Sequence, residues 1–309
     1  MHSKKIIVVG SSNMDMVVRA ERIPVPGETI LSGSFFMNPG GKGANQAVAA
    51  ARLGGDVTFV SKLGCDVFGA EFAQLFKAEG IDTSLLLSDK DHPSGVALIT
   101  VDRKGENSIV VASGANAHLL VEDLEDARTA IASAGFLLIQ LEIPIHTVSH
   151  VAAFAAANGV RVILNPAPAQ VLTMELLRNI DILTPNETEA SLISGIPVTD
   201  IRSAAEAAKI LCGFGVKQVI VTMGAMGALI CEMGNCSIVE APRVIPVDTT
   251  AAGDVFNGAL AVALSEGKNM HAAVQFACAA AAISVTRPGA QVSVPYRSEI
   301  AEEVTTPHR

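Results

Sequence analysis

The sequence predicts an α/β protein, in which helices cover both faces of a mostly parallel β-sheet and a small second sheet lies beside it. Two observations lead to this prediction. Short β-branched or aliphatic runs alternate with helix-like segments through most of the 309 residues, as in successive βαβ units. Residues 15–37 and 94–113 interrupt this alternation with strand-like runs that have no helix between them. We therefore expect one large domain with an excursion.

The main sheet and its helices are predicted from hydrophobic periodicity. The expected strands cover residues 6–9, 57–60, 136–140, 161–164, 182–183 and 218–222. The expected helices cover residues 43–53, 68–79, 121–133, 147–158, 187–194, 203–213, 253–265 and 271–285.

The small sheet is predicted from the two interrupting regions. In each region, apolar runs are separated by turn residues, such as Pro24, Pro26 and Gly27 in the first. These patterns indicate antiparallel strands joined by turns, and we expect the two regions to meet as one sheet. Such a sheet can act as a lid that excludes water from a reaction. A hairpin that only mediates contacts between subunits is the alternative, and both roles are compatible.

Composition excludes two classes of function. The net charge is −9, and the chain has one Tyr and no Trp, which argues against a nucleic-acid-binding surface. No segment approaches the ~20 apolar residues of a membrane span. The five cysteines, at positions 65, 212, 231, 236 and 278, form no Cys-x-x-Cys pair. We expect reduced, mostly buried thiols and a cytoplasmic protein.

The most informative segment is 248–254, Asp-Thr-Thr-Ala-Ala-Gly-Asp, which runs into an apolar helix. Its small side chains let backbone N–H groups approach an anion, and the helix N-terminus adds partial positive charge. A carboxylate such as Asp254 beside a phosphate suits removal of a proton from an attacking hydroxyl. An ordinary helix N-cap is the alternative role for Asp254.

Further polar residues follow predicted strands, where the ligands of open α/β sheets gather. Asn13 and Asp15 follow the first strand, and Glu142 follows the strand at 136–140. The glycine-rich segment 40–46 opens a helix and carries Lys42 and Asn45, which suit hydrogen bonds to a polyol. The alternatives are turn-forming or solvated side chains.

Two other strand ends suggest nucleotide contacts. Asn186 and Glu189 lie three residues apart at a helix start and could reach a hydrated Mg²⁺, or they could simply cap the helix. The turn at 222–227 contains two glycines that would let backbone approach a nucleotide. The sequence has neither a P-loop motif nor a Gly-x-Gly-x-x-Gly motif after the first strand, which disfavours P-loop kinases and nicotinamide dehydrogenases.

Four motifs in this order, at 40–47, 165–168, 185–189 and 248–254, resemble those of the ribokinase-like sugar kinase family over nearly the whole chain. The resemblance implies a single Rossmann-like α/β kinase domain, residues 1–309, with a β-sheet lid formed by residues 14–38 and 94–113. It also implies ATP-dependent phosphorylation of D-ribose at O5 to give D-ribose 5-phosphate and ADP, and a homodimer formed through the lid.

The resemblance also assigns residues to roles. Asp254 is the implied base, and the amides of Ala251, Ala252 and Gly253 stabilise the transferring phosphoryl group. The implied sugar contacts are Asn13, Asp15, Gly41, Lys42, Asn45 and Glu142. The implied nucleotide contacts are Asn186, Thr222, Met223, Gly224, Ala225, Met226, Gly227, Gly253 and Cys278. Mg²⁺ would come with ATP, held through water by Asn186 and Glu189. An activating K⁺ would lie at Asp248, Thr250, Ser284, Arg287, Gly289 and Ser293.

Two positions depart from the family pattern. Many relatives have Gly where this chain has Ala251, and a polar residue near the adenine where it has Cys278. The alternatives are a kinase for deoxyribose, another small sugar or a nucleoside, and a non-catalytic sugar-binding regulator. Asn13 favours ribose over deoxyribose, and the intact Asp254 argues against a pure sensor.

Overall fold

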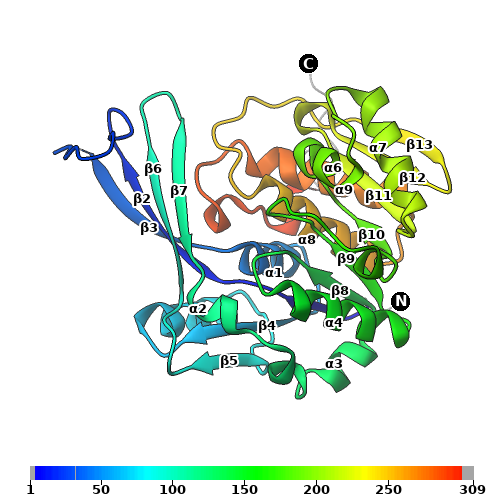
Figure 1. Cartoon of the computed structure of the whole chain (residues 1–309), viewed down its shortest axis with the longest axis horizontal. Coiled ribbons are helices and arrows are strands. Elements are labelled where there is room, and N and C mark those ends of the chain that lie inside the picture. The colour runs from blue at the N-terminus through cyan, green and yellow to red at the C-terminus, as the bar shows by residue number, and fades with distance from the viewer. Residues whose placement is uncertain (1–3, 32, 301–309) are drawn as a thin grey trace.

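A computed structural model describes residues 4–31 and 33–300. The predicted domain and lid also include residues 1–3, 32 and 301–309, which lie outside the described residues. Figure 1 shows a large sheet flanked by helices, with a smaller sheet extending from one side of it.

The main sheet has nine strands within the described residues, in the order β13-β12-β11-β10-β9-β8-β1-β4-β5. Their bounds are β1 Ile6–Val9, β4 Val57–Gly64, β5 Leu86–Asp89, β8 Phe136–Ile139, β9 Arg161–Leu164, β10 Ile182–Leu183, β11 Gln218–Thr222, β12 Ala228–Glu232 and β13 Asn235–Val239. All neighbours are parallel except β11–β12 and β12–β13. The predicted mostly parallel sheet is confirmed, although β5, β12 and β13 were not predicted.

Both faces of the sheet are buried, as the continuous apolar strands require. Ile6 and Val8 of β1 face one core, and Ile7 and Val9 face the other. The first core packs against α1 Lys42–Arg52, α2 Val67–Ala78, α8 Ala252–Ser265 and α9 Met270–Ser284. The second packs against α3 Arg128–Ser133, α4 Ile145–Ala157, α5 Met174–Leu177, α6 Glu187–Ser194 and α7 Ile201–Gly213.

Two sequence-based expectations need correction. The helix predicted at 121–133 is broken into a 3₁₀ turn, η2 Val121–Leu124, and the short α3. The Asp123 carboxylate caps the start of η2, accepting from the Leu120 amide at 2.8 Å and from Lys62 Nζ at 2.9 Å. Between η2 and α3 the backbone makes i→i−3 bonds, such as Ala127 N–H to the Leu124 carbonyl, in place of helical ones. The thiols are all free, but Cys65 is exposed, so the expectation that they are mostly buried was wrong for this residue.

The small sheet, called here the lid sheet, has the order β3-β2-β6-β7. Its strands are β2 Asn13–Arg19, β3 Ser34–Gly40, β6 Gly95–Val101 and β7 Asn107–Ala112. Each region forms an antiparallel hairpin, as predicted, and the two hairpins join through the parallel pair β2–β6. Because β2 follows β1 after three residues, the lid sheet is attached directly at the carboxyl edge of the main sheet.

Across the described residues, the longest apolar helices are too short to cross a membrane.

Candidate active site

The candidate site lies where the strand order reverses, between β1 and β8. The chain leaves these strands at Ser11 and Glu142, whose side chains meet: Ser11 Oγ donates to Glu142 Oε2 at 2.6 Å. The same oxygen accepts from the Lys42 backbone N–H at 3.0 Å and lies 3.5 Å from Asn13 Nδ2. The structure therefore brings together three residues that the sequence predicted as sugar contacts.

Gly41 is required for this arrangement. It is the N-cap of α1, with φ of 88°, and a Cβ there would lie 2.6 Å from the Asn13 backbone nitrogen. The glycine therefore brings the start of α1 against β2, and its role in this structure is close backbone packing. That packing places Lys42 and Asn45 at the carboxyl edge of the sheet.

Asp254 is a buried carboxylate held by two amides from α1. Asn45 Nδ2 donates to its Oδ2 at 3.0 Å, and Gln46 Nε2 donates to its Oδ1 at 2.9 Å. The N-cap of α8 is Ala251, which makes no capping bond through its side chain. The N-cap role for Asp254 is therefore wrong, because its carboxylate is directed at a neighbouring helix and not at its own amides.

Gln46 was not among the predicted site residues, yet it organises this part of the site. Its Nε2 also donates to Asn165 Oδ1 at 3.1 Å, and its Oε1 accepts from Gln140 Nε2 at 2.6 Å. This network fixes the orientation of the Gln46 amide, so that its nitrogen and not its oxygen is directed at Asp254. The signal was available in the sequence, because Gln46 stands beside Asn45 in the first turn of the same helix and within the motif at 40–47.

One acceptor beside Asp254 has no partner. Asn45 is 5 % exposed, and its Nδ2 donates to Asp254. Its Oδ1 is buried and has no hydrogen-bond donor among the described residues. A buried orphan acceptor is costly in free energy and usually marks the place of a ligand or water. The atom that would satisfy it is a donor such as a hydroxyl, next to the carboxylate.

The electrostatics of the site follow from crowded carboxylates. Burial raises the pKa of Asp254, while Lys42, Asn45 and Gln46 oppose this rise. Burial, with Glu142 and then Asp254, raises the pKa of Asp15 to about 7. Burial works against the charge of Lys42, but the surrounding carboxylates raise its pKa above the ordinary value. The positive charge of Lys42 favours the ionised forms of Asp15 and Asp254 and so opposes the effect of burial on both.

The turn that leads into α8 has free amides. Ala251 has φ of 60°, a left-handed conformation that is strained for a residue with a side chain. The Ala252 N–H donates to the Thr249 carbonyl at 3.2 Å. The amides of Ala251 and Gly253 have no partner within the described residues. Two of the three predicted anion-binding amides are therefore available, and the third is used within the turn.

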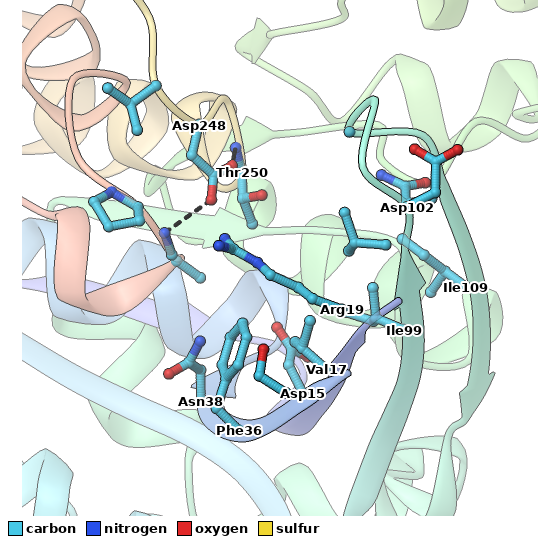
Figure 2. Close-up of a pocket in the computed structure, with 18 of the residues that line it drawn as sticks. Asp15, Val17, Arg19, Phe36, Asn38, Ile99, Asp102, Ile109, Asp248 and Thr250 are labelled. Carbon is cyan, nitrogen blue, oxygen red and sulfur yellow. Dashed lines mark hydrogen bonds between the residues drawn. The ribbon is translucent and has the colours of Figure 1, made fainter. Parts of the chain in front are cut away.

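A cleft of about 1220 Å³ separates the inner face of the lid sheet from the loops at 246–250 and 288–292 (Figure 2). Of the predicted site residues, Asp15, Asp248, Thr250 and Gly289 line it. Arg19, which was not predicted, points from β2 across the cleft toward Asp248 and Thr250 (Figure 2).

The residues predicted to bind K⁺ are only partly assembled through their side chains. Asp248 accepts from the Thr250 and Gly289 amides, both at 2.9 Å, so these three residues lie together. The hydroxyls of Ser284 and Ser293 donate to carbonyls within their own turns, and Arg287 pairs with Glu299.

Most of the predicted nucleotide residues lie at the ends of β10 and β11, whereas Gly253 lies on α8 and Cys278 on α9. Asn186 and Thr222 form a bridge between these strand ends. Asn186 and Glu189 form a capping box, with bonds of 2.8 and 2.9 Å. Glu189 is buried, and burial raises the pKa of its carboxyl, while Asn186 and Lys42 oppose this rise.

The turn at Met223–Gly227 is a short hairpin between β11 and β12. Gly224, Ala225 and Met226 are exposed, while Met223 is buried. Gly227 has φ of 96°, and a Cβ there would lie 2.0 Å from the Val239 carbonyl oxygen, so it serves packing of the hairpin. Cys278 is buried in the core, and burial raises the pKa of its thiol to about 12, which makes it unreactive.

Comparisons with known proteins agree with this geometry. The profile of the pfkB family carbohydrate kinases matches residues 3–297. The chain is 46 % identical over 299 residues to a ribokinase of Haemophilus influenzae, covering 97 % of this chain and 98 % of the relative. It is 38 % identical over 291 residues to a deoxyribokinase of Salmonella typhi, covering 94 % and 95 %.

Among solved structures, the chain is similar to the ribokinase of Arabidopsis thaliana complexed with ribose and ATP. The TM-score is 0.93 and the sequence identity is 35 %, with 99 % of this chain and 100 % of that chain covered. With a matching family profile, close relatives of full length and a shared fold, the chain belongs to the pfkB family of carbohydrate kinases.

Proposed function

We propose that this protein transfers the γ-phosphoryl group of ATP to O5 of D-ribose, giving D-ribose 5-phosphate and ADP. The observation that carries the proposal is the buried Asp254 carboxylate, fixed by Asn45 and Gln46, beside the orphan acceptor Asn45 Oδ1. A sugar hydroxyl at this place would donate to one of these oxygens and present its own oxygen to the phosphoryl group. The ribokinase relatives support ribose and ATP as the substrates.

Asp254 acts as the base in this proposal. Lys42 and the two amide donors favour its ionised form against the effect of burial, and the ionised carboxylate would accept the proton of the O5 hydroxyl as the O–P bond forms. The free amides of Ala251 and Gly253 would stabilise charge on the transferring group, and the N-terminus of α8 would add to their effect. The bond between the γ-phosphorus and the bridging oxygen of ADP breaks, and ADP leaves with that oxygen.

The proposed sugar contacts are Asn13, Asp15, Gly41, Lys42, Asn45 and Glu142. Asn13 and the Lys42 backbone contact Glu142, and Asn45 donates to Asp254. Asp15 lies close enough to Glu142, Asp254 and Lys42 for their charges to shift its pKa. The proposed nucleotide contacts are Asn186, the turn at 222–227, Gly253 and Cys278.

Mg²⁺ bound to ATP fits the chemistry of Glu189 and Asn186. Both Glu189 oxygens accept bonds from Asn186, so we propose contact through water, which suits an ion that keeps its hydration shell. When bound, Mg²⁺ neutralises part of the phosphate charge.

K⁺ fits the oxygen-only donors around Asp248, Thr250 and Gly289, with Ser284, Arg287 and Ser293 supplying further oxygens. We expect turnover at fixed Mg²⁺ and ionic strength to rise, mainly in kcat, when K⁺ replaces a bulky organic cation. Equal rates with all monovalent cations would contradict the cation site and leave the kinase proposal standing.

The proposed activity is tested by ADP release with ATP and a panel of pentoses, hexoses and nucleosides. D-ribose should give the highest kcat/KM, and 2-deoxyribose a lower one, because a pocket built for the missing hydroxyl leaves polar groups unpaired. A preference for 2-deoxyribose would favour the second candidate, a deoxyribokinase, which the Salmonella relative also supports. Binding without turnover of any sugar would favour a regulator.

We also propose a homodimer formed through the lid sheet. The outer face of this sheet is apolar and exposed, with Val18, Phe35, Met37, Leu98 and Val110 on one side of the register. Sedimentation of the wild type at dimer mass, and of Phe35→Glu at monomer mass, would support this; a monomeric wild type would exclude it. The five free thiols are compatible with a reducing cytoplasm, where we propose the protein acts.

A further inference from the structure

Arg19 is a basic residue in the cleft that the proposed chemistry does not use. It lies on the inner face of β2, on the same side as Asp15 and Val17, since side chains two residues apart share a face. Its guanidinium carbon lies 5.5 Å from the centre of the Phe36 ring, which holds the side chain over the cleft. Figure 2 shows it directed toward Asp248 and Thr250 on the opposite wall.

The opposite wall contains a carboxylate that ties two loops together. Asp248 holds the Thr250 amide with one oxygen and the Gly289 amide with the other. Thr250 leads directly into Ala251, Ala252 and Gly253, whose amides we propose as the anion site. The position of Asp248 therefore determines where that turn lies.

Arg19 and Asp248 line the same cleft from opposite walls, and Figure 2 shows the Arg19 side chain directed toward Asp248. Arg19 has no ion pair within the described residues, whereas Arg103, the other arginine that lines the cleft, pairs with Glu21. Arg19 thus remains available for a partner that comes closer.

The same strand carries both a proposed sugar contact and this free cation. We propose that Arg19 is a positioning residue. When Asp15 contacts the sugar, the lid sheet closes over it, and this closure brings the Arg19 guanidinium onto Asp248. The contact with Asp248 then fixes the anion-binding turn. This coupling rests on the proposed function. A charge-assisted, two-pronged contact between guanidinium and carboxylate would be formed only in the closed state. Sugar binding would then strengthen nucleotide binding, and the reverse, by the same factor.

The test measures this coupling by calorimetry in the absence of catalysis. The Kd of a non-hydrolysable ATP analogue is determined for the intact protein with and without saturating D-ribose. We expect ribose to tighten the analogue by about 10-fold in the wild type, within the usual range of coupling between sites. In Arg19→Gln the factor should fall below about 2-fold, while the Kd of each ligand alone stays within about 2-fold of wild type.

Arg19→Lys should retain part of the coupling, because the charge remains but the planar two-pronged contact is lost. The matched control is Arg103→Gln, which removes a cation from the same sheet and should leave the coupling unchanged.

If the wild type phosphorylates ribose but the coupling is undiminished in Arg19→Gln, the role of Arg19 is wrong. An equal loss of coupling in Arg103→Gln would also overturn it. A wild type that neither binds nor phosphorylates ribose would instead overturn the proposed function, and the coupling with it. These two failures are therefore distinguishable from the turnover of the wild type alone.

Discussion

The floor of the site and the lid sheet above it are built differently. On the floor, the Asp254 carboxylate, the Gln46 amide and the Glu142 carboxylate each hydrogen-bond to two or more groups on other elements, at distances between 2.6 and 3.5 Å. On the inner face of the lid sheet, Asp15 and Arg19 project into the cleft without such partners among the described residues. These polar groups of the floor are therefore paired in the absence of substrate, whereas the two groups of the lid sheet are not.

This difference suggests a division of labour. A network of satisfied buried groups is rigid, which suits the proton transfer and charge stabilisation that need fixed geometry. A face of unpaired charged groups can reach new partners, which suits recognition and closure. Substitutions on the floor should therefore change kcat and its pH dependence, and substitutions on the lid should change KM and coupling.

The strongest test of the floor is Asp254→Asn. Loss of the base should lower kcat by ~10²-fold or more, while binding of the ATP analogue remains, because Asn has nearly the same shape. Steady-state turnover and calorimetric binding measure the two quantities. Circular dichroism controls for folding. A kcat close to wild type in a folded variant would show that Asp254 is not the base and that the rigid floor has another purpose.

The corresponding test of the lid is Asp15→Asn. It should raise the KM for ribose by about 10-fold or more, since a hydrogen bond to a charged group is worth roughly 1.5–3 kcal/mol. The control is Asp102→Asn at the outer turn of the lid sheet, which should leave KM unchanged. If Asp15→Asn changed only kcat, the lid would take part in chemistry, and the division proposed above would be wrong.

Asp15 also gives a prediction about stability and pH. Its pKa is raised to about 7 in the folded state from an ordinary value of 3.8, so between these pH values the folded protein holds more protons than the unfolded chain. The free energy of unfolding should therefore fall as pH rises from about 4 to 7. Asp15→Asn removes this loss, so its melting temperature should exceed that of wild type at pH 8 and match it near pH 4.

A subtler test of the floor is Gln46→Met. It removes the donor to Asp254 Oδ1, so the pKa of Asp254 should rise further and the acidic limb of the kcat profile should move to higher pH. We expect about a 10-fold loss of kcat at pH 6 and less at pH 8. Gln140→Met is the matched control, because it breaks a bond of 2.6 Å in the same network without touching Asp254. Superimposable pH profiles for wild type and Gln46→Met would contradict this role.

The smallest expected effect concerns Ala251, in the turn that leads into α8. Ala251→Gly should relieve the left-handed strain at φ of 60°, worth at most about 1 kcal/mol after the extra flexibility of the unfolded glycine is counted. Denaturant unfolding should show a stability equal to or slightly above wild type. A loss larger than about 1 kcal/mol would mean that the alanine methyl group makes packing contacts that outweigh the strain.

Much of the fold was predictable because it depends on local patterns. The strands at β1, β9, β10 and β11 and the helix α6 have the predicted bounds, since apolar runs and helix starts are written in consecutive residues. β5 and β13 were missed because they are edge strands with mixed polar patterns, whereas the buried apolar strand β12 was missed although its pattern is typical of a strand. The segment at 121–133 was predicted as one helix, and the structure divides it into η2 and α3.

The sequence by itself determined which residues stand at the strand ends, and so which polar groups can meet at one edge of a parallel sheet. Asp254, Asn45, Lys42 and Glu142 were predictable on that basis, with the family motifs assigning their roles. The tertiary structure decided how they are used. Gln46 became the partner of Asp254 only because α8 packs tightly on α1, where a Cβ at Gly258 would lie 2.7 Å from that of Ala49. Arg19 faces Asp248 only because two hairpins join into one sheet over the cleft. Distances between elements remote in sequence depend on packing, which no local pattern of residues encodes.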